Sequence, residues 1–362
     1  MVRMEKNMNI YVPTLIYSEK DCVKKYGRIM SKTGRKALIV TGKNSSRVNG
    51  SLDDVIKALE ANEGQYVIFD RVEENPSIET VMEARKLGIQ EKVDYIIGVG
   101  GGSPIDAAKA IALMIGNPQC DESILFENTM RRYLPVVAVP TTAGTGTEVT
   151  PYSILTIHEK RTKKSISHRI YPVLALVDYK YLKTQSQEVL VNTAIDALAH
   201  LVESYLNTKA DDLNKMYSEK GLRLFGDIKD RLKTPEDAVY ITLSNMAMIA
   251  GMAIAHTGTS LPHGLSYMLT YELGIPHGKA CGLYLGKYME IYEEKDKESV
   301  DKVLGNLGME SVIEFKDYLK TLLGEVSVPE EILKANAKGM MSNEDKLKNY
   351  PFQVKMEELD SI

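Results

Sequence analysis

Short apolar runs and helical patterns alternate along the first half of the chain. Residues 36–41, 66–70 and 93–99 are brief runs rich in apolar and β-branched residues, typical of strands. Between them, residues 52–60 and 78–87 place apolar side chains at helical spacing. This order predicts a parallel, doubly wound α/β sheet.

The pattern continues to about residue 183 and then changes. Residues 104–114 favour a helix, and residues 134–139, 152–157 and 173–177 favour strands. Long helical patterns follow at the ranges 189–206, 213–232, 238–256 and 278–292. We therefore expect an α/β domain over residues 1–185 and an all-helical domain over 186–362, with a polar, loosely packed tail from Met340.

Composition narrows the class of protein. The chain of 362 residues is 44% hydrophobic and 26% charged, with a net charge of −4, which argues against a nucleic acid or an anionic membrane as main partner. The longest apolar stretch, residues 246–255, is too short to span a bilayer, and the first ten residues lack a signal-peptide run. The three cysteines form no CxxC motif, so a cytoplasmic protein with reduced thiols is expected.

A glycine-rich loop joins the buried run 93–99 to the helix that follows it. Gly100, Gly101 and Gly102 let the backbone approach a ligand closely. Ser103 suits an N-cap and Pro104 the first helical position, so the free N–H groups there can hold a pyrophosphate. The spacing is not GxGxxG, and a tight turn without a ligand is the alternative.

A second loop, PTTAGTGTE at residues 140–148, also follows a strand. Two such loops at the carboxyl ends of strands predict a crevice for a nucleotide. A solvated Thr/Gly turn is the alternative.

Acidic and imidazole side chains gather in the second half. Asp196 and His200 lie four residues apart on a helix that is apolar nearly all round, so both project from one buried face. An Asp–His hydrogen bond within that helix is one explanation. His263 and His277 each stand in a Pro-His-Gly tripeptide, fourteen residues apart, and Gly274 allows the chain between them to fold back.

One carboxylate and three neutral imidazoles form a donor set suited to Fe(II) or Zn(II). The alternative for each tripeptide is a loop with a surface histidine. Cys281 follows His277 by one helical turn and can approach the metal, although a small buried residue is the simpler expectation. Glu203 is expected to be solvated or hydrogen-bonded to a ligand rather than to be a ligand.

These motifs resemble those of the iron-containing, or group III, alcohol dehydrogenases. The resemblance rests on GGGSPIDAAKA at 100–110, PTTAGTGTEVT at 140–150, DALAH, PHGLS and GIPHGKACG, and it covers nearly the whole chain. It implies a dinucleotide-binding α/β domain, an all-helical domain of the dehydroquinate synthase-like type, and an active site in the cleft. It also implies NAD(P), Fe(II) or sometimes Zn(II), and the metal ligands Asp196, His200, His263 and His277.

The resemblance also implies cofactor contacts from the loops of the α/β domain. The residues concerned are Gly42, Ser45, Ser46, Gly100, Gly101, Gly102, Ser103, Asp106, Thr141, Thr142, Thr145, Thr147, Lys163 and Leu182.

The chain departs from this family in two places. Tyr267 stands where many relatives have a second histidine, so the proton route is left open among Tyr267, Lys163, water and the cofactor ribose. Gly42 stands where NAD-preferring relatives often carry an aspartate, and Lys43, Ser45, Ser46 and Arg47 follow it. Without the carboxylate, a 2′-phosphate is not repelled, which predicts NADP(H) preference over NAD. An ordinary polar turn is the alternative.

The expected reaction is hydride transfer between NADP(H) and a small primary alcohol or aldehyde. The rivals are a polyol dehydrogenase of the glycerol or propanediol type, a cyclase of the same fold, and a nucleotide-binding protein without catalysis. A homodimer is also expected, since the alternating apolar positions of residues 10–16 could pair between subunits.

Overall fold

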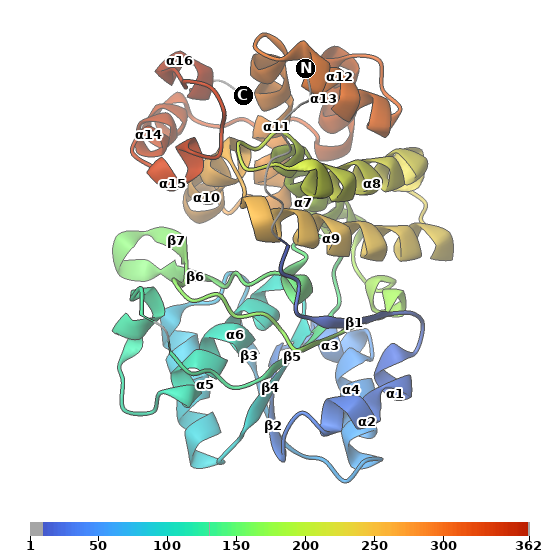
Figure 1. Ribbon diagram of the computed structural model, residues 1–362, viewed down its shortest axis with the longest axis vertical. Helices are drawn as coiled ribbons and strands as arrows, with labels where there is room; N and C mark the ends of the chain where they lie inside the picture. Colours follow the sequence, from blue (N-terminus) through green and yellow to red (C-terminus); the bar gives the residue numbers. More distant parts are fainter. Residues whose placement is uncertain (1–9, 130, 361–362) are drawn as a thin grey trace. The chain divides into compact units, whose positions relative to one another are not determined.

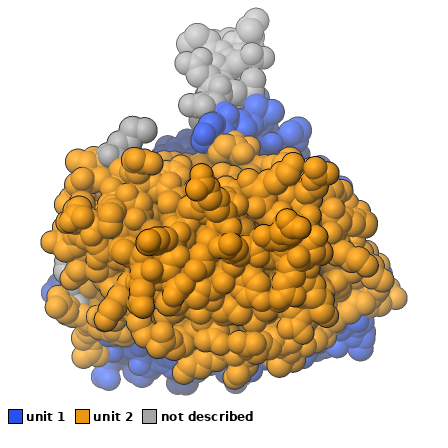
Figure 2. Space-filling view, turned by 90° about the horizontal axis from the view of Figure 1, so that it is seen from below, with its two compact units in different colours: residues 1–11, 187–235, 245–362 blue, residues 12–186, 236–244 orange. Residues whose placement is uncertain are grey.

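The computed structural model describes residues 10–129 and 131–360. They divide into two compact units, coloured separately in Figure 2. One unit, here the sheet unit, contains Val12–Ser186 and Glu236–Ser244. The other, here the helical unit, contains Gln187–Pro235 and the chain from Asn245 onward.

A six-stranded sheet forms the centre of the sheet unit, and all its paired strands are parallel. In spatial order its strands are β1 (Leu15–Ser18), β8 (Leu174–Val177), β5 (Val136–Pro140), β4 (Tyr95–Gly100), β2 (Lys36–Gly42) and β3 (Gln65–Val72). Every residue of β4 is buried, as its continuous apolar run predicts. The doubly wound α/β fold is confirmed.

Helices cover both faces of this sheet, each over its own apolar core (Figure 1). One face carries α5 (Ile78–Gln90) and α6 (Gly102–Gly116), and the other carries α1 (Cys22–Lys25), α2 (Gly27–Ser31) and α4 (Ser51–Glu60). The short α3 (Ser45–Val48) follows β2. Of these helices α6 is the most deeply buried, with every residue from Ala107 to Ile115 inside the core.

One strand expectation needs correction. The segment 152–157 does not join the main sheet: β6 (Ile154–Ile157) pairs antiparallel with β7 (Thr162–Ser165). The sequence TKKS of β7 is polar, so hydrophobic patterning misses it. In the alternating segment 10–16, Leu15 and Ile16 begin β1, which pairs with β8 and forms an edge of the described sheet.

The helical unit is built around α7 (Gln187–Tyr205), which is buried from Ala194 to Tyr205. The further helices are α8 (Asp212–Ile228), α9 (Asp237–Thr257), α10 (Leu261–Leu273), α11 (His277–Glu293), α12 (Lys297–Leu307), α13 (Val312–Leu323), α14 (Glu330–Met340), α15 (Glu344–Leu347) and α16 (Met356–Leu359). Short 3₁₀ turns lie at Glu122–Phe126, Thr147–Val149, His158–Lys160, Tyr179–Leu182 and Lys229–Arg231.

Helix α9 is longer than the apolar stretch that the sequence indicated. The apolar stretch 246–255 belongs to a helix of 21 residues, which by length and composition alone could cross a bilayer. However, 56% of its most apolar window is buried inside the protein, as in a core helix. Its residues up to Ser244 belong to the sheet unit, and those from Asn245 to the helical unit.

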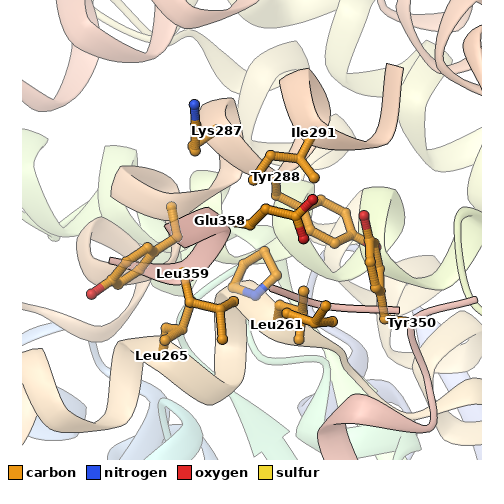
Figure 3. Close-up of a pocket in the computed structure, with 11 residues that line it drawn as sticks. Leu261, Leu265, Lys287, Tyr288, Ile291, Tyr350, Glu358 and Leu359 are labelled. Carbon is orange, nitrogen blue, oxygen red and sulfur yellow. The ribbon is translucent and has the colours of Figure 1, made fainter. Parts of the chain in front are cut away.

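The tail beyond Met340 is mostly exposed or half-buried, but a few of its side chains are buried against the helical unit. Tyr350 and Leu359 are 4% and 3% exposed, and the ring of Tyr350 lies 5.7 Å from that of Tyr288. Both residues help to line the pocket in Figure 3, beside Leu261 and Leu265 of α10. The pocket holds a cavity of about 20 Å³, room for about one water molecule, so it is too small for a substrate.

Candidate functional site

Three helices bring the predicted metal ligands together. Asp196 and His200 lie one turn apart on the buried face of α7. His263 is the third residue of α10 and His277 the first of α11, each directly after a proline. Proline is well suited to a helix start, so both Pro-His-Gly tripeptides mark helix N-termini and are not surface loops.

A glycine allows α11 to approach α7 closely. A β-carbon on Gly278 would lie 1.8 Å from the carbonyl oxygen of Asn192 and 3.0 Å from Cβ of Asp196. No side chain fits in that space. The glycine of the second tripeptide therefore places His277 beside Asp196.

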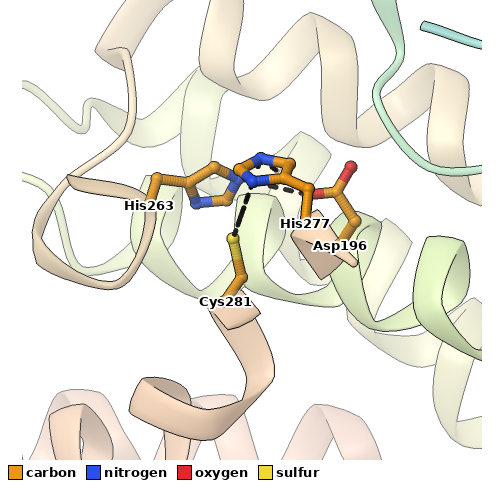
Figure 4. A group of neighbouring side chains, drawn as sticks. All are labelled: Asp196, His263, His277 and Cys281. Carbon is orange, nitrogen blue, oxygen red and sulfur yellow. Dashed lines mark hydrogen bonds and ion pairs between the residues drawn. The ribbon is translucent and has the colours of Figure 1, made fainter. Parts of the chain in front are cut away.

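The donor atoms converge on one oxygen of Asp196 (Figure 4). Asp196 Oδ1 lies 3.3 Å from His263 Nε2, 3.7 Å from His277 Nε2 and 3.9 Å from His200 Nε2. The rings of His200 and His263 stack with centroids 4.3 Å apart. One donor atom from each of Asp196, His263, His277 and Cys281 lies within 4.8 Å of the others.

Several buried polar atoms of this group have no hydrogen-bond partner in the described part of the chain and could bind a cation. Asp196 Oδ1, His200 Nδ1 and His263 Nε2 are buried and have no hydrogen-bond partner among the described residues. Leaving such atoms unpaired costs about 1–3 kcal/mol each. A divalent ion between the Asp196 oxygen and the imidazole nitrogens would satisfy the carboxylate and stabilise this arrangement.

Glu203 fixes the orientation of His263. It is fully buried, and it accepts hydrogen bonds from His263 Nδ1 (2.7 Å), from the backbone N–H of His263 (2.9 Å) and from that of Ser260 (3.1 Å). Because Nδ1 carries the proton, Nε2 is free to face Asp196. Of the two roles expected for Glu203, the structure shows the hydrogen bond to a predicted ligand, His263. Its seven-residue spacing from Asp196 places it on the same helix face.

Ser266 fixes the orientation of His277, a role that the sequence analysis did not predict. Its hydroxyl donates to the carbonyl oxygen of His263 (2.8 Å) and lies 3.2 Å from His277 Nδ1. With its proton used, the hydroxyl oxygen accepts from Nδ1–H and leaves Nε2 for a metal. The available signal was its position one turn after His263 in the PHGLS motif.

Electrostatics favour positive charge at this point. Burial would raise the pKa of Asp196, but His200, His263 and His277 hold it below its usual range. Burial lowers the pKa of His200 to about 3, so this imidazole is neutral, the form that binds metals. Burial also lowers the pKa of His263, but the charges of Cys281 and Glu203 raise it further than burial lowers it. Burial raises the pKa of Cys281, yet His263 and His277 bring it down to about 7.

Tyr267 lies beside this group. Its ring stacks on His277 with centroids 5.7 Å apart and an interplanar angle of 23°. Lys346 Nζ lies 5.7 Å from the centre of the same ring. The structure thus brings the tyrosine to the imidazoles, as its place one turn after His263 predicts.

The predicted cofactor residues of the sheet unit gather at one edge of the sheet. Strands β2, β4 and β5 are neighbours, and they end at Gly42, Gly100 and Pro140. The two loops touch: a β-carbon on Gly101 would lie 3.1 Å from Thr142 Oγ1, and one on Gly102 would lie 2.7 Å from Thr145 Cγ2. Thr141 joins them through a hydrogen bond from its N–H to Gly100 O (2.9 Å).

The start of α6 differs from the prediction. Gly101, not Ser103, is the N-cap, and Pro104 is the third helical residue. The Ser103 hydroxyl instead accepts a hydrogen bond from the N–H of Asn75 (3.0 Å). The glycines allow the helix to begin earlier, and a proline is tolerated throughout the first turn because its N–H would have no helical partner. The free N–H groups of Gly102 and Ser103 therefore lie at this helix start.

Lys109 ties the second loop to α6, and it too was missed. Its fully buried Nζ donates to the carbonyl oxygens of Thr147 (2.7 Å), Thr150 (2.9 Å) and Tyr152 (2.7 Å). Burial lowers its pKa to about 8. Asp106 accepts from the Thr147 hydroxyl and from the N–H of Ile154, so these two predicted cofactor residues also hold the loop. A lone lysine in the apolar helix α6 was the signal.

Other predicted cofactor residues already have partners. Lys163 on β7 donates to Asn75 Oδ1 (2.6 Å), and Leu182 is buried. Ser46 is buried and accepts from the Thr41 hydroxyl (2.6 Å).

In the turn after Gly42, one of the basic residues already forms an ion pair. Arg47 pairs with Asp70 at 2.8 Å. Lys43 and Ser45 are exposed.

Comparison with known proteins gives matches over both units. Residues 13–179 match the family model described as iron-containing alcohol dehydrogenase, and residues 190–349 match that of the C-terminal part of the Fe-containing alcohol dehydrogenase family. A crystal structure of an iron-containing alcohol dehydrogenase from Thermotoga maritima is 38% identical, with a TM-score of 0.91 over 97% of each chain.

Two curated relatives are similar over much of their length. The NADPH-dependent butanol dehydrogenase of Clostridium saccharobutylicum is 26% identical over 89% of this chain and 85% of its own. The lactaldehyde reductase of Escherichia coli K12 is 31% identical over 70% of this chain and 68% of its own.

Proposed function

Because the chain belongs to the iron-containing alcohol dehydrogenase family, and is thus an oxidoreductase acting on CH–OH groups, we propose that it transfers hydride between NADP(H) and a small primary alcohol or aldehyde. The observation that carries this proposal is the convergence of unpartnered, buried donor atoms on Asp196. A cluster of this kind, in a chain with glycine-rich loops at a parallel sheet edge, suits a dehydrogenase that uses both a metal and a nucleotide.

In this proposal Asp196, His200, His263 and His277 hold a divalent ion, Fe(II) or Zn(II). When bound, that ion supplies Lewis-acid polarisation of the substrate oxygen. Glu203 and Ser266 keep His263 and His277 in the tautomer that presents Nε2. Tyr267, which stacks on His277, is the candidate for proton transfer.

The cofactor is proposed to lie along the carboxyl edge of the sheet. The N–H groups of Gly102 and Ser103 at the start of α6 would bind the pyrophosphate, and the nicotinamide carries the hydride. NADP(H) is favoured over NAD(H) because Gly42 offers no carboxylate and exposed Lys43 and Ser45 follow it. Lys109 keeps the Thr-rich loop in place.

Three further proposals concern the whole chain. The functional domains are residues 1–185 and 186–362. The protein acts in the cytoplasm, in keeping with its free cysteines. It forms a homodimer, since β1 lies at an edge of the described sheet.

A panel of primary alcohols and diols, each assayed with NADP⁺ and with NAD⁺, tests the activity. We expect NADP⁺ reduction that is abolished by a chelator and restored by Fe(II) or Zn(II). A diol used faster than every simple alcohol would favour the polyol substrate that the similarity to lactaldehyde reductase suggests. Turnover that resists the chelator, or none with any substrate, would contradict the proposal.

A further inference from the structure

The Cys281 thiol lies among the metal donors rather than in an apolar core. It is fully buried on α11, one turn after His277, and its sulfur lies 3.8 Å from His277 Nε2 (Figure 4). Its other neighbours in the group, Asp196 and His263, are 3% and 2% exposed, and each presents an atom without a hydrogen-bond partner among the described residues. A thiol that only filled space would not be expected among unpaired polar atoms.

Donor separations match those of a tetrahedral site. Metal–donor bonds of roughly 2.0–2.3 Å place neighbouring donors about 3.4–3.6 Å apart in a tetrahedron. The distances from Asp196 Oδ1 to His263 Nε2 and His277 Nε2 are 3.3 and 3.7 Å, and that from His277 Nε2 to Cys281 Sγ is 3.8 Å. The group whose donors all lie within 4.8 Å of one another contains the Cys281 sulfur and no His200 nitrogen.

We propose that the Cys281 thiolate is a direct ligand of the divalent ion, together with Asp196, His263 and His277. His200, with Nε2 3.9 Å from Asp196 Oδ1, then supplies a more distant fifth donor. This inference rests on the proposed function, because it presupposes a metal at this place.

A sulfur ligand changes the properties of the centre. The thiol loses its proton on binding, so the ligands carry two negative charges in place of one and neutralise the ion. Thiolate is a soft donor and favours Zn(II) over Fe(II), compared with a site of oxygen and nitrogen alone. We therefore expect the metal site of this chain to prefer Zn(II) over Fe(II) more strongly than the same site without Cys281.

Replacement of the metal by Co(II) tests the ligand directly. The metal-depleted full chain is titrated with Co(II), and the near-ultraviolet absorption is followed for a thiolate-to-cobalt charge-transfer band. Wild type is expected to show the band at about one Co(II) per chain. C281S is expected to bind Co(II) without it, whereas C22S, which removes an equally buried thiol from the sheet unit, keeps it.

The same variants are compared in Zn(II) binding. C281S should lose about tenfold or more in Zn(II) affinity, with a smaller loss for Fe(II). C281A serves as the second variant if C281S fails to fold. A wild type that binds Co(II) without the band, or a Zn(II) affinity unchanged by both substitutions, overturns the inference and leaves the proposed function standing. A wild type that binds no divalent ion overturns both.

Discussion

At the scale of single residues, the proposed chemistry depends on side chains that set the direction of others. Glu203 bonds to Nδ1 of His263 and to two N–H groups at the start of α10. A glutamate with three such bonds fixes the imidazole and the helix end together. Ser266 repeats this at His277 with one hydroxyl. Neither residue belongs to the predicted ligand set.

E203Q should weaken metal binding although Glu203 is not a predicted ligand. The amide nitrogen of glutamine would face an N–H donor, so at least one of the three bonds is lost and His263 is no longer held. We expect a 10- to 100-fold loss of metal affinity, measured by competition with a chelator. E188Q, on an exposed position of the same helix, is the matched control. Equal affinity in the two variants would show that Glu203 does not orient the site.

G42D should reverse the proposed cofactor preference. A carboxylate at the end of β2 would repel a 2′-phosphate and accept a hydrogen bond from a ribose hydroxyl. We expect KM for NADP⁺ to rise about tenfold, equivalent to about 1.4 kcal/mol, with KM for NAD⁺ unchanged or lower. G42A is the control, because its β-carbon meets the same neighbour, the Val72 carbonyl oxygen at 3.3 Å. An equal response of KM for NADP⁺ to both substitutions would argue against a 2′-phosphate at this turn.

At the scale of elements, the candidate metal site lies at the N-terminal ends of two helices, beside a third. α10 and α11 start at the two Pro-His-Gly tripeptides, and each start places a histidine against α7. The sequence indicates the histidines, but the predicted helices leave out α10, because Pro262 and Gly264 interrupt the apolar pattern in its first turn. Gly278, the glycine of the second tripeptide, is needed because α11 packs so closely on α7 that no side chain fits between them. The sequence alone does not show this packing.

G278A should separate these two helices. Its methyl group would overlap the Asn192 carbonyl oxygen, so α11 must shift and His277 must move from Asp196. We expect a loss of about 3 kcal/mol or more in unfolding free energy, together with weaker metal binding. Thermal denaturation checks the first effect. G305A on α12, where a β-carbon meets nothing within 4 Å, should instead be neutral or stabilising. A G278A protein as stable as G305A would contradict the packing described.

At the scale of the whole molecule, the sequence predicts the sheet unit well and the helical unit in part. Hydrophobic runs such as that of β4 locate parallel strands because both sheet faces are buried. The polar strand β7 and the packed tail around Tyr350 depend on contacts distant in sequence, which periodicity does not contain. The sequence predicts that Asp196, His200, His263 and His277 belong to one site because metal ligands are of few chemical types, and the structure brings these four side chains together. Lys109, Ser266 and the orienting role of Glu203 required the fold.

The proposed alcohol dehydrogenase activity of this chain requires a divalent ion bound at Asp196. The most direct measurement is the iron and zinc content of anaerobically purified wild type and of D196N, which keeps the shape of the side chain and removes its charge. We predict about one ion per chain in wild type and at least a tenfold lower content in D196N, with a parallel loss of alcohol-dependent NADP⁺ reduction. Equal metal content in the two proteins would show that Asp196 does not hold the ion, and full activity of a metal-free wild type would show that the reaction does not need one.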